Sequence, residues 1–276
     1  GATIKNLGLK AVRNYEFLLP PLQTQKRIAD ILSAYDDLIE NNLKRIKLLE
    51  QAAQNIYKEW FVNLRFPGHE NTPINKKTGL PEGWENLKLK DIIEYKVDNR
   101  GRNPKYYTES GIPVIDNFLL KDEAYVKISQ CKRYIDDELF ENFVRKYLKP
   151  KDILITLVGN GYGSVSIAPK TRSVIIQNTI GLRCNELCSQ YFLYCYLFQN
   201  KSDIRSRNRG AAQPSVKVGD LLDMNTNIPT LNLINKFTEI VNPNFELIET
   251  LGIQNQKLEA ARDILLPRLM NRTIEI

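Results

Sequence analysis

The chain has 276 residues, of which 42% are hydrophobic and 26% are charged, and its formal net charge is +7. These values are typical of a globular protein and exclude wholesale disorder. No apolar run approaches the roughly 20 residues that a membrane span needs, and a single histidine, His69, argues against histidine-based catalysis.

The first strong element is a long helix. Its apolar positions recur at alternating spacings of three and four residues, which is typical of the contact seam of a coiled coil. The seam positions are Leu32, Tyr35, Ile39, Asn42, Ile46, Leu49, Ala53, Ile56 and Trp60. Ser33 is a good N-cap residue, so we expect a short helix, a break near Ser33 and a long helix over residues 34–64.

A Pro/Gly/Asn-rich linker, residues 67–83, precedes a segment of mixed pattern. Strands are predicted at Ile112–Ile115, Asp152–Val158, Ser164–Ala168 and Ser173–Cys184, and a helix at Ser189–Gln199. This mixture indicates an α+β domain. Residues 159–163 (GNGYG) could form a phosphate-binding loop, but a strand rather than a helix follows them, which favours a tight hairpin.

The end of the chain repeats its beginning. Residues 1–67, moved forward by 209 positions, align without a gap on residues 210–276, with Leu38-Ile39-Glu40 on Leu247-Ile248-Glu249. The second seam comprises Val241, Asn244, Ile248, Leu251, Asn255, Leu258, Arg262, Leu265 and Leu269. We expect a break at Asn242, with Pro243 in the first turn, and an end or kink at Pro267.

Each seam needs a partner, and two arrangements are possible. Each helix could pack on the middle domain, or the two helices could pair with each other. We favour an antiparallel pair in which Asn42 and Asn255 share one polar layer, because a facing pair of amides satisfies both side chains and fixes the register.

Positive charge is concentrated in the middle of the chain, where residues 84–215 hold 21 basic and 15 acidic residues. The densest clusters are residues 100–107 and 201–209. Basic clusters interleaved with aromatic and amide residues suit a phosphate backbone and base edges, although a solvated face is the alternative. Candidate phosphate or guanine contacts are Arg100, Arg102, Lys105, Arg205, Arg207 and Arg209. Candidate base or sugar contacts are Tyr106, Tyr107, Asn160, Tyr162, Ser164, Gln177, Asn178, Gln213 and Ser215.

Signals for catalysis or for a metal site are weak. Glu94-Tyr95-Lys96 resembles the end of a nuclease motif, but no suitably placed upstream aspartate accompanies it. The four cysteines form no C-x-x-C pair, so we expect no metal site, a buried free thiol at Cys195 and a reducing cytoplasm.

Several short motifs, in their order along the chain, resemble the DNA specificity subunits of type I restriction-modification systems. They are residues 19–32 (LPPLQTQKRIADIL), 80–84 (LPEGW), 111–113 (GIP), 149–154 (KPKDIL), 177–180 (QNTI) and 210–215 (GAAQPS). In that family two target-recognition domains alternate with two helical regions, each domain reads half of a split DNA site, and the antiparallel helices act as a spacer.

The resemblance implies an α+β fold with one recognition domain flanked by two long helices. The expected divisions are a helical region at 1–66, the end of a preceding recognition domain within 1–17, a linker at 67–83, a recognition domain at 84–215 and a second helical region at 216–276. The chain then resembles the C-terminal half of such a subunit, or a half-sized form that could form a homodimer.

The resemblance also implies partners. Double-stranded DNA and methyltransferase subunits carrying S-adenosylmethionine are expected, and a restriction subunit using ATP and Mg²⁺ could join them. No cofactor, metal, membrane or catalysis is expected in this chain itself. The rival hypotheses are a coiled-coil scaffold that does not read DNA and a nuclease built on Glu94–Lys96.

Overall fold

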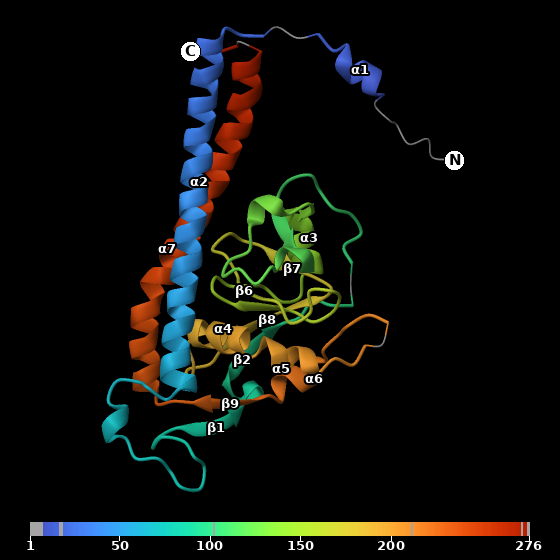
Figure 1. Ribbon diagram of the computed structural model, residues 1–276. Helices are drawn as coiled ribbons and strands as arrows, with labels where there is room; N and C mark the ends of the chain where they lie inside the picture. The colour runs from blue at the N-terminus through green and yellow to red at the C-terminus, as the bar shows by residue number, and fades with distance from the viewer. Residues whose placement is uncertain (1–7, 17–18, 102, 211, 272, 275–276) are drawn as a thin grey trace. The chain divides into compact units, whose positions relative to one another are not determined.

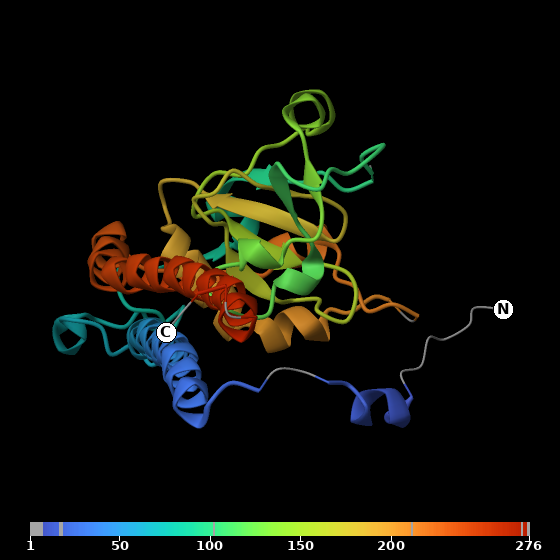
Figure 2. The same cartoon turned by 90° about the horizontal axis from the view of Figure 1, so that it is seen from above.

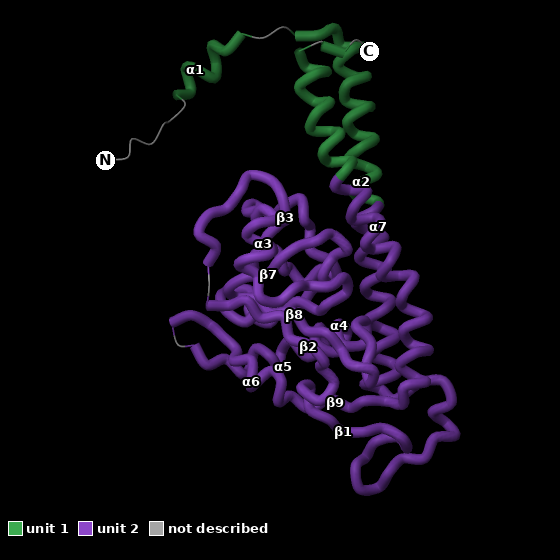
Figure 3. The backbone as a smooth tube through the Cα atoms, turned by 180° about the vertical axis from the view of Figure 1, so that it is seen from behind, with its two compact units in different colours: residues 1–41, 257–276 green, residues 42–256 purple. Residues whose placement is uncertain are grey.

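The computed structural model describes residues 8–16, 19–101, 103–210, 212–271 and 273–274. The chain divides into two compact units, one of residues 1–41 with 257–276 and the other of residues 42–256 (Figure 3). Among the described residues, none of the helices combines the length and the apolarity that crossing a membrane requires.

Two long helices dominate the structure. Helix α2 covers Leu22–Tyr57, ends in a π-helical turn at Lys58–Val62, and belongs to the first unit up to residue 41. Helix α7 covers Leu231–Met270 and belongs to the first unit from residue 257. The first unit also holds the short helix α1 (Leu9–Arg13). Within this unit Arg262 of α7 donates to Asp36 of α2 over 2.6 Å.

The breaks expected near Ser33 and at Asn242 are wrong, and α7 does not end at Pro267. Helix α2 continues through Ser33, and α7 continues through Asn242, Pro243 and Pro267. A kink at Pro267 stays a prediction. A proline inside a helix removes one backbone hydrogen bond and costs about 3 kcal/mol. Near Pro243 this cost is outweighed by packing, because Val241 and Phe245 are fully buried on either side. Tertiary packing thus overrides the local signal for a break.

The two helices run antiparallel and meet at a polar layer. In the second unit Asn42 Nδ2 donates to Asn255 Oδ1 over 2.9 Å, and the two side chains are only 2% and 4% exposed. The predicted pairing of these two residues is confirmed. The neighbouring seam residues Ile248 and Leu251 are buried, and Ile46 and Leu49 are half-buried. In the first unit Ile39 is buried, and Leu32, Tyr35, Leu258 and Leu265 are half-buried.

Three sheets form the middle of the second unit (Figure 1). The strands are β1 (Glu85–Lys88), β2 (Ile93–Val97), β3 (Ile112–Ile115), β4 (Tyr134–Ile135), β5 (Ile153–Thr156), β6 (Val165–Ile167), β7 (Val174–Ile175), β8 (Thr179–Cys184) and β9 (Asn225–Ile228). The largest sheet is antiparallel, in the order β2-β8-β5-β6. In the sheet β4-β3-β7, strand β3 is antiparallel to β4 and parallel to β7, and the third sheet pairs β1 with β9.

The described part of this unit also holds four short α-helices, α3 (Asp137–Phe143), α4 (Gln190–Gln199), α5 (Lys201–Ser206) and α6 (Val218–Leu222). It has 3-10 turns at His69–Asn71, Leu89–Ile92, Asn117–Leu119 and Ile128–Gln130. Two of the α-helices begin at side-chain caps. Asp136 accepts the backbone N–H of Leu139 at the start of α3, and Ser189 accepts that of Phe192 at the start of α4. Helix α4 is apolar on all sides because it is buried, and its Cys195 is a fully buried free thiol, as predicted.

Both faces of the central strand β5 are buried. Ile153 and Ile155 point into the main core, and Leu154 points into a second core on the opposite face. The main core includes aromatic rings from α2, α4 and α7, which lie on one side of the large sheet (Figures 1 and 2). The ring of Phe61 lies 5.0 Å from that of Phe192 and 5.2 Å from that of Phe237. The helices therefore also pack on the domain, and both arrangements considered from the sequence occur together.

The fold class is the one predicted, a mixed α/β domain between two long antiparallel helices. Four predicted strands match, with Ser173–Cys184 divided into β7 and β8. Residues 159–163 join the antiparallel strands β5 and β6, so the hairpin prediction is confirmed. The sequence did not reveal β1, β2, β4 or β9, and β1 and β9 pair across about 140 residues. The division at 84–215 stays a prediction.

Candidate DNA interface

An open recess of about 530 Å³ lies on the domain, lined by Arg100, Gly101, Asn103, Gln177 and Asn178. Its residues come from the loop after β2 and from the turn between β7 and β8. Gln177 Nε2 donates to Asn103 Oδ1, which links two segments 74 residues apart in the sequence. The recess thus brings together three of the predicted contact residues and Asn103, which the sequence reasoning missed.

Gln177 has an unusual backbone conformation. Its φ is +61°, in the left-handed region that residues other than glycine rarely adopt. The flanking residues hold it there, because Ile176 is 3% exposed and the backbone carbonyl of Asn178 accepts the N–H of Leu157 over 2.7 Å. Such strain persists where the surroundings determine it, and it is concentrated at functional sites.

Arg100 is held by an acidic neighbour. Its Nε and Nη2 donate to the two carboxylate oxygens of Asp98, each over 2.8 Å. These hydrogen bonds lower the pKa of Asp98, so the carboxylate stays ionised and compensates the charge of Arg100. The other predicted basic residues of this loop differ. Lys105 is exposed, and Arg102 lies outside the described residues.

The β5–β6 hairpin and the segment after α5 lie side by side. The backbone N–H of Gly159 donates to the carbonyl of Pro214 over 2.9 Å, and Val158 bridges to Ser215. Further along, Arg205 Nε donates to the carbonyl of Tyr162 over 3.3 Å. These contacts bring the predicted groups at 160–164, 205 and 213–215 to one region of the domain. Within it Asn160 and Gln213 are exposed, whereas Ser164 is buried.

The basic residues of this segment are paired with carboxylates. Arg209 lies 2.8 Å from Asp220, and Arg207 lies 3.1 Å from Asp203. Arg205 lies 3.8 Å from Asp122 and is 44% exposed. Exposed ion pairs contribute only about 0–1 kcal/mol. The exposed Arg205 and Arg209 can therefore exchange these partners for phosphate groups at small cost, whereas Arg207 is half-buried and also donates to the backbone carbonyl of Asp220.

Two tyrosines predicted as contact residues lie near β4. Tyr106 is exposed, and its hydroxyl donates to Asp136 over 2.9 Å. Tyr107 is half-buried, with the guanidinium of Arg133 4.6 Å from its ring centre and donating to its hydroxyl over 2.9 Å. Tyr106 is thus the more accessible of the two rings.

The three residues that resemble the end of a nuclease motif lie together on one strand. Glu94, Tyr95 and Lys96 lie on β2, and the ring of Tyr95 is covered by cations, with Lys146 Nζ at 5.1 Å and Arg183 at 5.0 Å. Over the part of the chain that the structure describes, no group of three or more His, Cys, Asp or Glu side chains could hold a metal ion.

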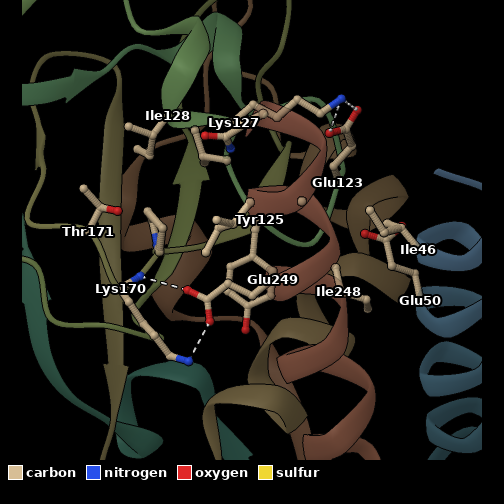
Figure 4. A pocket seen from close by; sticks show the side chains of 15 residues that line it. Ile46, Glu50, Glu123, Tyr125, Lys127, Ile128, Lys170, Thr171, Ile248 and Glu249 are labelled. Carbon is tan, nitrogen blue, oxygen red and sulfur yellow. Dashed lines mark hydrogen bonds and ion pairs between the residues drawn. The ribbon is translucent and has the colours of Figure 1, made fainter. Parts of the chain in front are cut away.

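A second pocket, of about 90 Å³, lies where α2 and α7 meet the domain in the second unit (Figure 4). Glu50 of α2 accepts the backbone N–H of Ala124 over 2.6 Å, and burial raises the pKa of Glu50 to about 7. Glu249 of α7 accepts the backbone N–H of Lys170 over 3.0 Å and pairs with its ammonium group at 3.2 Å. One glutamate from each helix thus anchors the domain.

Comparison with known proteins assigns the family. The model of the type I restriction modification DNA specificity domain matches residues 1–51 and 81–260. This match takes in most of the sequence, including residues of both long helices and most of the domain between them. The chain belongs to this family.

Among similar proteins, the MjaIX specificity subunit of a type I restriction enzyme from Methanocaldococcus jannaschii is 28% identical over 98% of this chain and 63% of its own length. The MjaVIII specificity subunit of the same organism is 24% identical over 100% of this chain and 66% of its own length. The HindI specificity subunit of Haemophilus influenzae is 22% identical, over 99% of this chain and 72% of its own length. The chain therefore spans somewhat less than two thirds of the first of these relatives.

A solved structure supports the fold. The type I restriction-modification S subunit from M. genitalium has a TM-score of 0.60 at 18% identity, covering 98% of this chain and 67% of that one. The HsdS subunit from Thermoanaerobacter tengcongensis has a TM-score of 0.50 at 16% identity, covering 98% of this chain and 64% of that one.

Proposed function

We propose that this chain is the part of a type I restriction-modification complex that chooses the DNA sequence. The observation that carries the proposal is the family match, which covers residues of both long helices and most of the domain between them. In this proposal residues 84–215 read one half of a split target. The helical regions at 1–66 and 216–276 set the distance to the other half.

In this proposal, different types of residue in the domain make different contacts with DNA. Phosphate contacts come from Lys105 and from Arg205, Arg207 and Arg209, whose ion pairs are partly exposed. Base edges are read by amide and hydroxyl groups around the recess and the hairpin. These groups belong to Asn160, Tyr162, Gln177, Asn178, Gln213 and Ser215, with Tyr106, Tyr107 and Ser164 at the margins of the interface.

The reaction belongs to partner subunits. Methyltransferase subunits bind S-adenosylmethionine and modify an adenine, and a restriction subunit can add cleavage driven by ATP with Mg²⁺. The chain itself catalyses no step and acts in the cytoplasm. The second half of the DNA target is read by a further recognition domain, on another part of the protein or on a second copy of this chain.

A salt titration tests whether Arg205, Arg207 and Arg209 contact DNA. Binding of the full chain to duplex DNA is measured from low to high salt by fluorescence anisotropy, for the wild type and for the triple variant Arg205→Ala, Arg207→Ala, Arg209→Ala. Each phosphate contact contributes about −0.9 to the slope of log affinity against log salt concentration. Loss of three contacts should flatten the slope by roughly 3 units.

A control variant loses the same charge elsewhere. Lys76→Ala, Lys77→Ala and Lys236→Ala remove three exposed positive charges from the linker and from the start of α7. This variant should keep the wild-type slope. Equal flattening in both variants, or no salt-dependent binding in the wild type, would contradict the proposal. The second result would favour a helical scaffold that does not touch DNA.

A further inference from the structure

The free hydrogen-bonding groups of the Asn103–Gln177 amide pair determine which base the pair can bind. Gln177 Nε2 donates to Asn103 Oδ1, which leaves the Gln177 carbonyl oxygen as a free acceptor and the Asn103 amino group as a free donor. Exchanging oxygen and nitrogen in both amides reverses the bond between them. The pair still presents one acceptor and one donor. This property does not depend on how the amides are oriented.

The free groups match one base in the major groove. Adenine presents an N7 acceptor beside an N6 amino donor, whereas guanine presents two acceptors, N7 and O6. Cytosine presents a donor, and thymine an acceptor beside a methyl group. A neighbouring donor and acceptor on the protein therefore complement adenine and leave one group unpaired against guanine.

The neighbouring arginine, Arg100, is held in place by Asp98. Its Nε N–H and one Nη2 N–H donate to the two carboxylate oxygens, over 2.8 Å each, and its other three N–H groups remain donors. The amide pair adds the free acceptor that the N6 amino group of adenine requires. The recess is open, and its volume of about 530 Å³ can admit the edge of a base pair.

We propose that the Asn103–Gln177 amide pair reads an adenine in the target duplex. The inference rests on the proposed function, because it assumes that this face of the domain meets DNA. In this arrangement the carbonyl oxygen of the pair accepts the adenine N6–H, and its amino group donates to N7. The positive φ of Gln177 holds its side chain toward Asn103 for this contact.

Selection of bound duplexes from a random library by the full chain tests the proposal. The wild type should select a motif that contains an adenine on which binding depends. In Gln177→Glu a carboxylate replaces the amide, so Asn103 turns its amino group inward and only acceptors remain free. The preference at that one position should then move from adenine to cytosine, a donor, by on the order of tenfold. Gln130→Glu makes the same change on an exposed residue outside the recess and should select the wild-type motif.

A further measurement keeps the test decisive. With the wild-type chain, 7-deazaadenine at the critical position removes N7 and should weaken binding by on the order of tenfold, while the same replacement at other adenines should not.

Two results would overturn the inference. A wild-type motif whose adenines all tolerate 7-deazaadenine, together with an unchanged motif in Gln177→Glu, would show that the amide pair does not read adenine and would leave the proposed function intact. A wild-type chain that selects no motif at all would overturn both.

Discussion

Glu50 offers a quantitative test of how the helices hold the domain. Its carboxylate accepts the backbone N–H of Ala124, and burial raises its pKa from 4.5 to about 7. Nearby Glu123 raises this pKa further, whereas Lys127 lowers it. The folded state therefore binds a proton on Glu50 more tightly than the unfolded state does, and the stability gained from this proton is lost as the pH rises.

The pKa shift of Glu50 sets the size of the change in folding stability. A difference of about 2.5 pKa units corresponds to roughly 3 kcal/mol at 1.36 kcal/mol per unit. This contribution is fully present below pH 4.5 and is lost as the pH rises to about 7. Glu50→Gln keeps an acceptor for the N–H of Ala124 and never ionises. The variant should thus be more stable than the wild type at pH 8 by on the order of 2–3 kcal/mol, and the difference should shrink toward zero near pH 4.5.

Urea unfolding at pH 5, 6, 7 and 8, followed by the fluorescence of Trp60 and Trp84, measures this difference. Glu186→Gln, a change of the same kind on an exposed side chain, is the control and should alter stability equally little at every pH. A constant difference between Glu50→Gln and the wild type across this range would refute the reasoning, because it would mean that Glu50 ionises normally in the folded protein.

Two further predictions concern buried polar contacts, each measured by urea unfolding. Asn42→Leu removes the donor to Asn255 and should cost about 1–3 kcal/mol, whereas Asn42→Leu with Asn255→Leu should recover part of this loss. A single variant as stable as the wild type would contradict the role of this layer. Asp152, which is fully buried, accepts two hydrogen bonds from Arg183 over 2.7 and 2.8 Å, so Asp152→Ala should cost about 3–5 kcal/mol. Asp137→Ala, which removes an exposed ion pair, should cost less than about 1 kcal/mol, and similar losses in the two variants would show that burial does not set the energy.

Regular local patterns were sufficient to predict the long helices and most strands. The spacing of apolar residues predicted the two helices and placed Asn42 opposite Asn255, because both amides lie within a seam that repeats over many turns. The same local reading failed at Ser33, which lies exposed within α2, and at Pro243, where the buried neighbours Val241 and Phe245 keep α7 continuous. Local capping signals are weaker than packing along a long interface.

The sequence patterns did not predict contacts between residues that are far apart in the chain. Strand β1 reads ENLK and its partner β9 reads NTNI, and neither has the apolar alternation that identifies a strand. Asn103 lay within a basic cluster noted from composition, but its contact with Gln177 joins loops 74 residues apart. The pairing of Arg205 with Asp122 was equally hidden. Charge counts along the sequence therefore overstate the positive charge that the domain presents.

The most direct test of the account is an exchange of the recognition domain in cells that carry the whole system. Residues 84–215 are replaced by the corresponding segment of a related specificity protein, and the methylated sequence motif is determined across the genome. The account predicts that one half of a split motif changes while the other half and the spacing between them stay the same. A motif that is unchanged by the exchange would contradict the claim that this domain selects the DNA sequence.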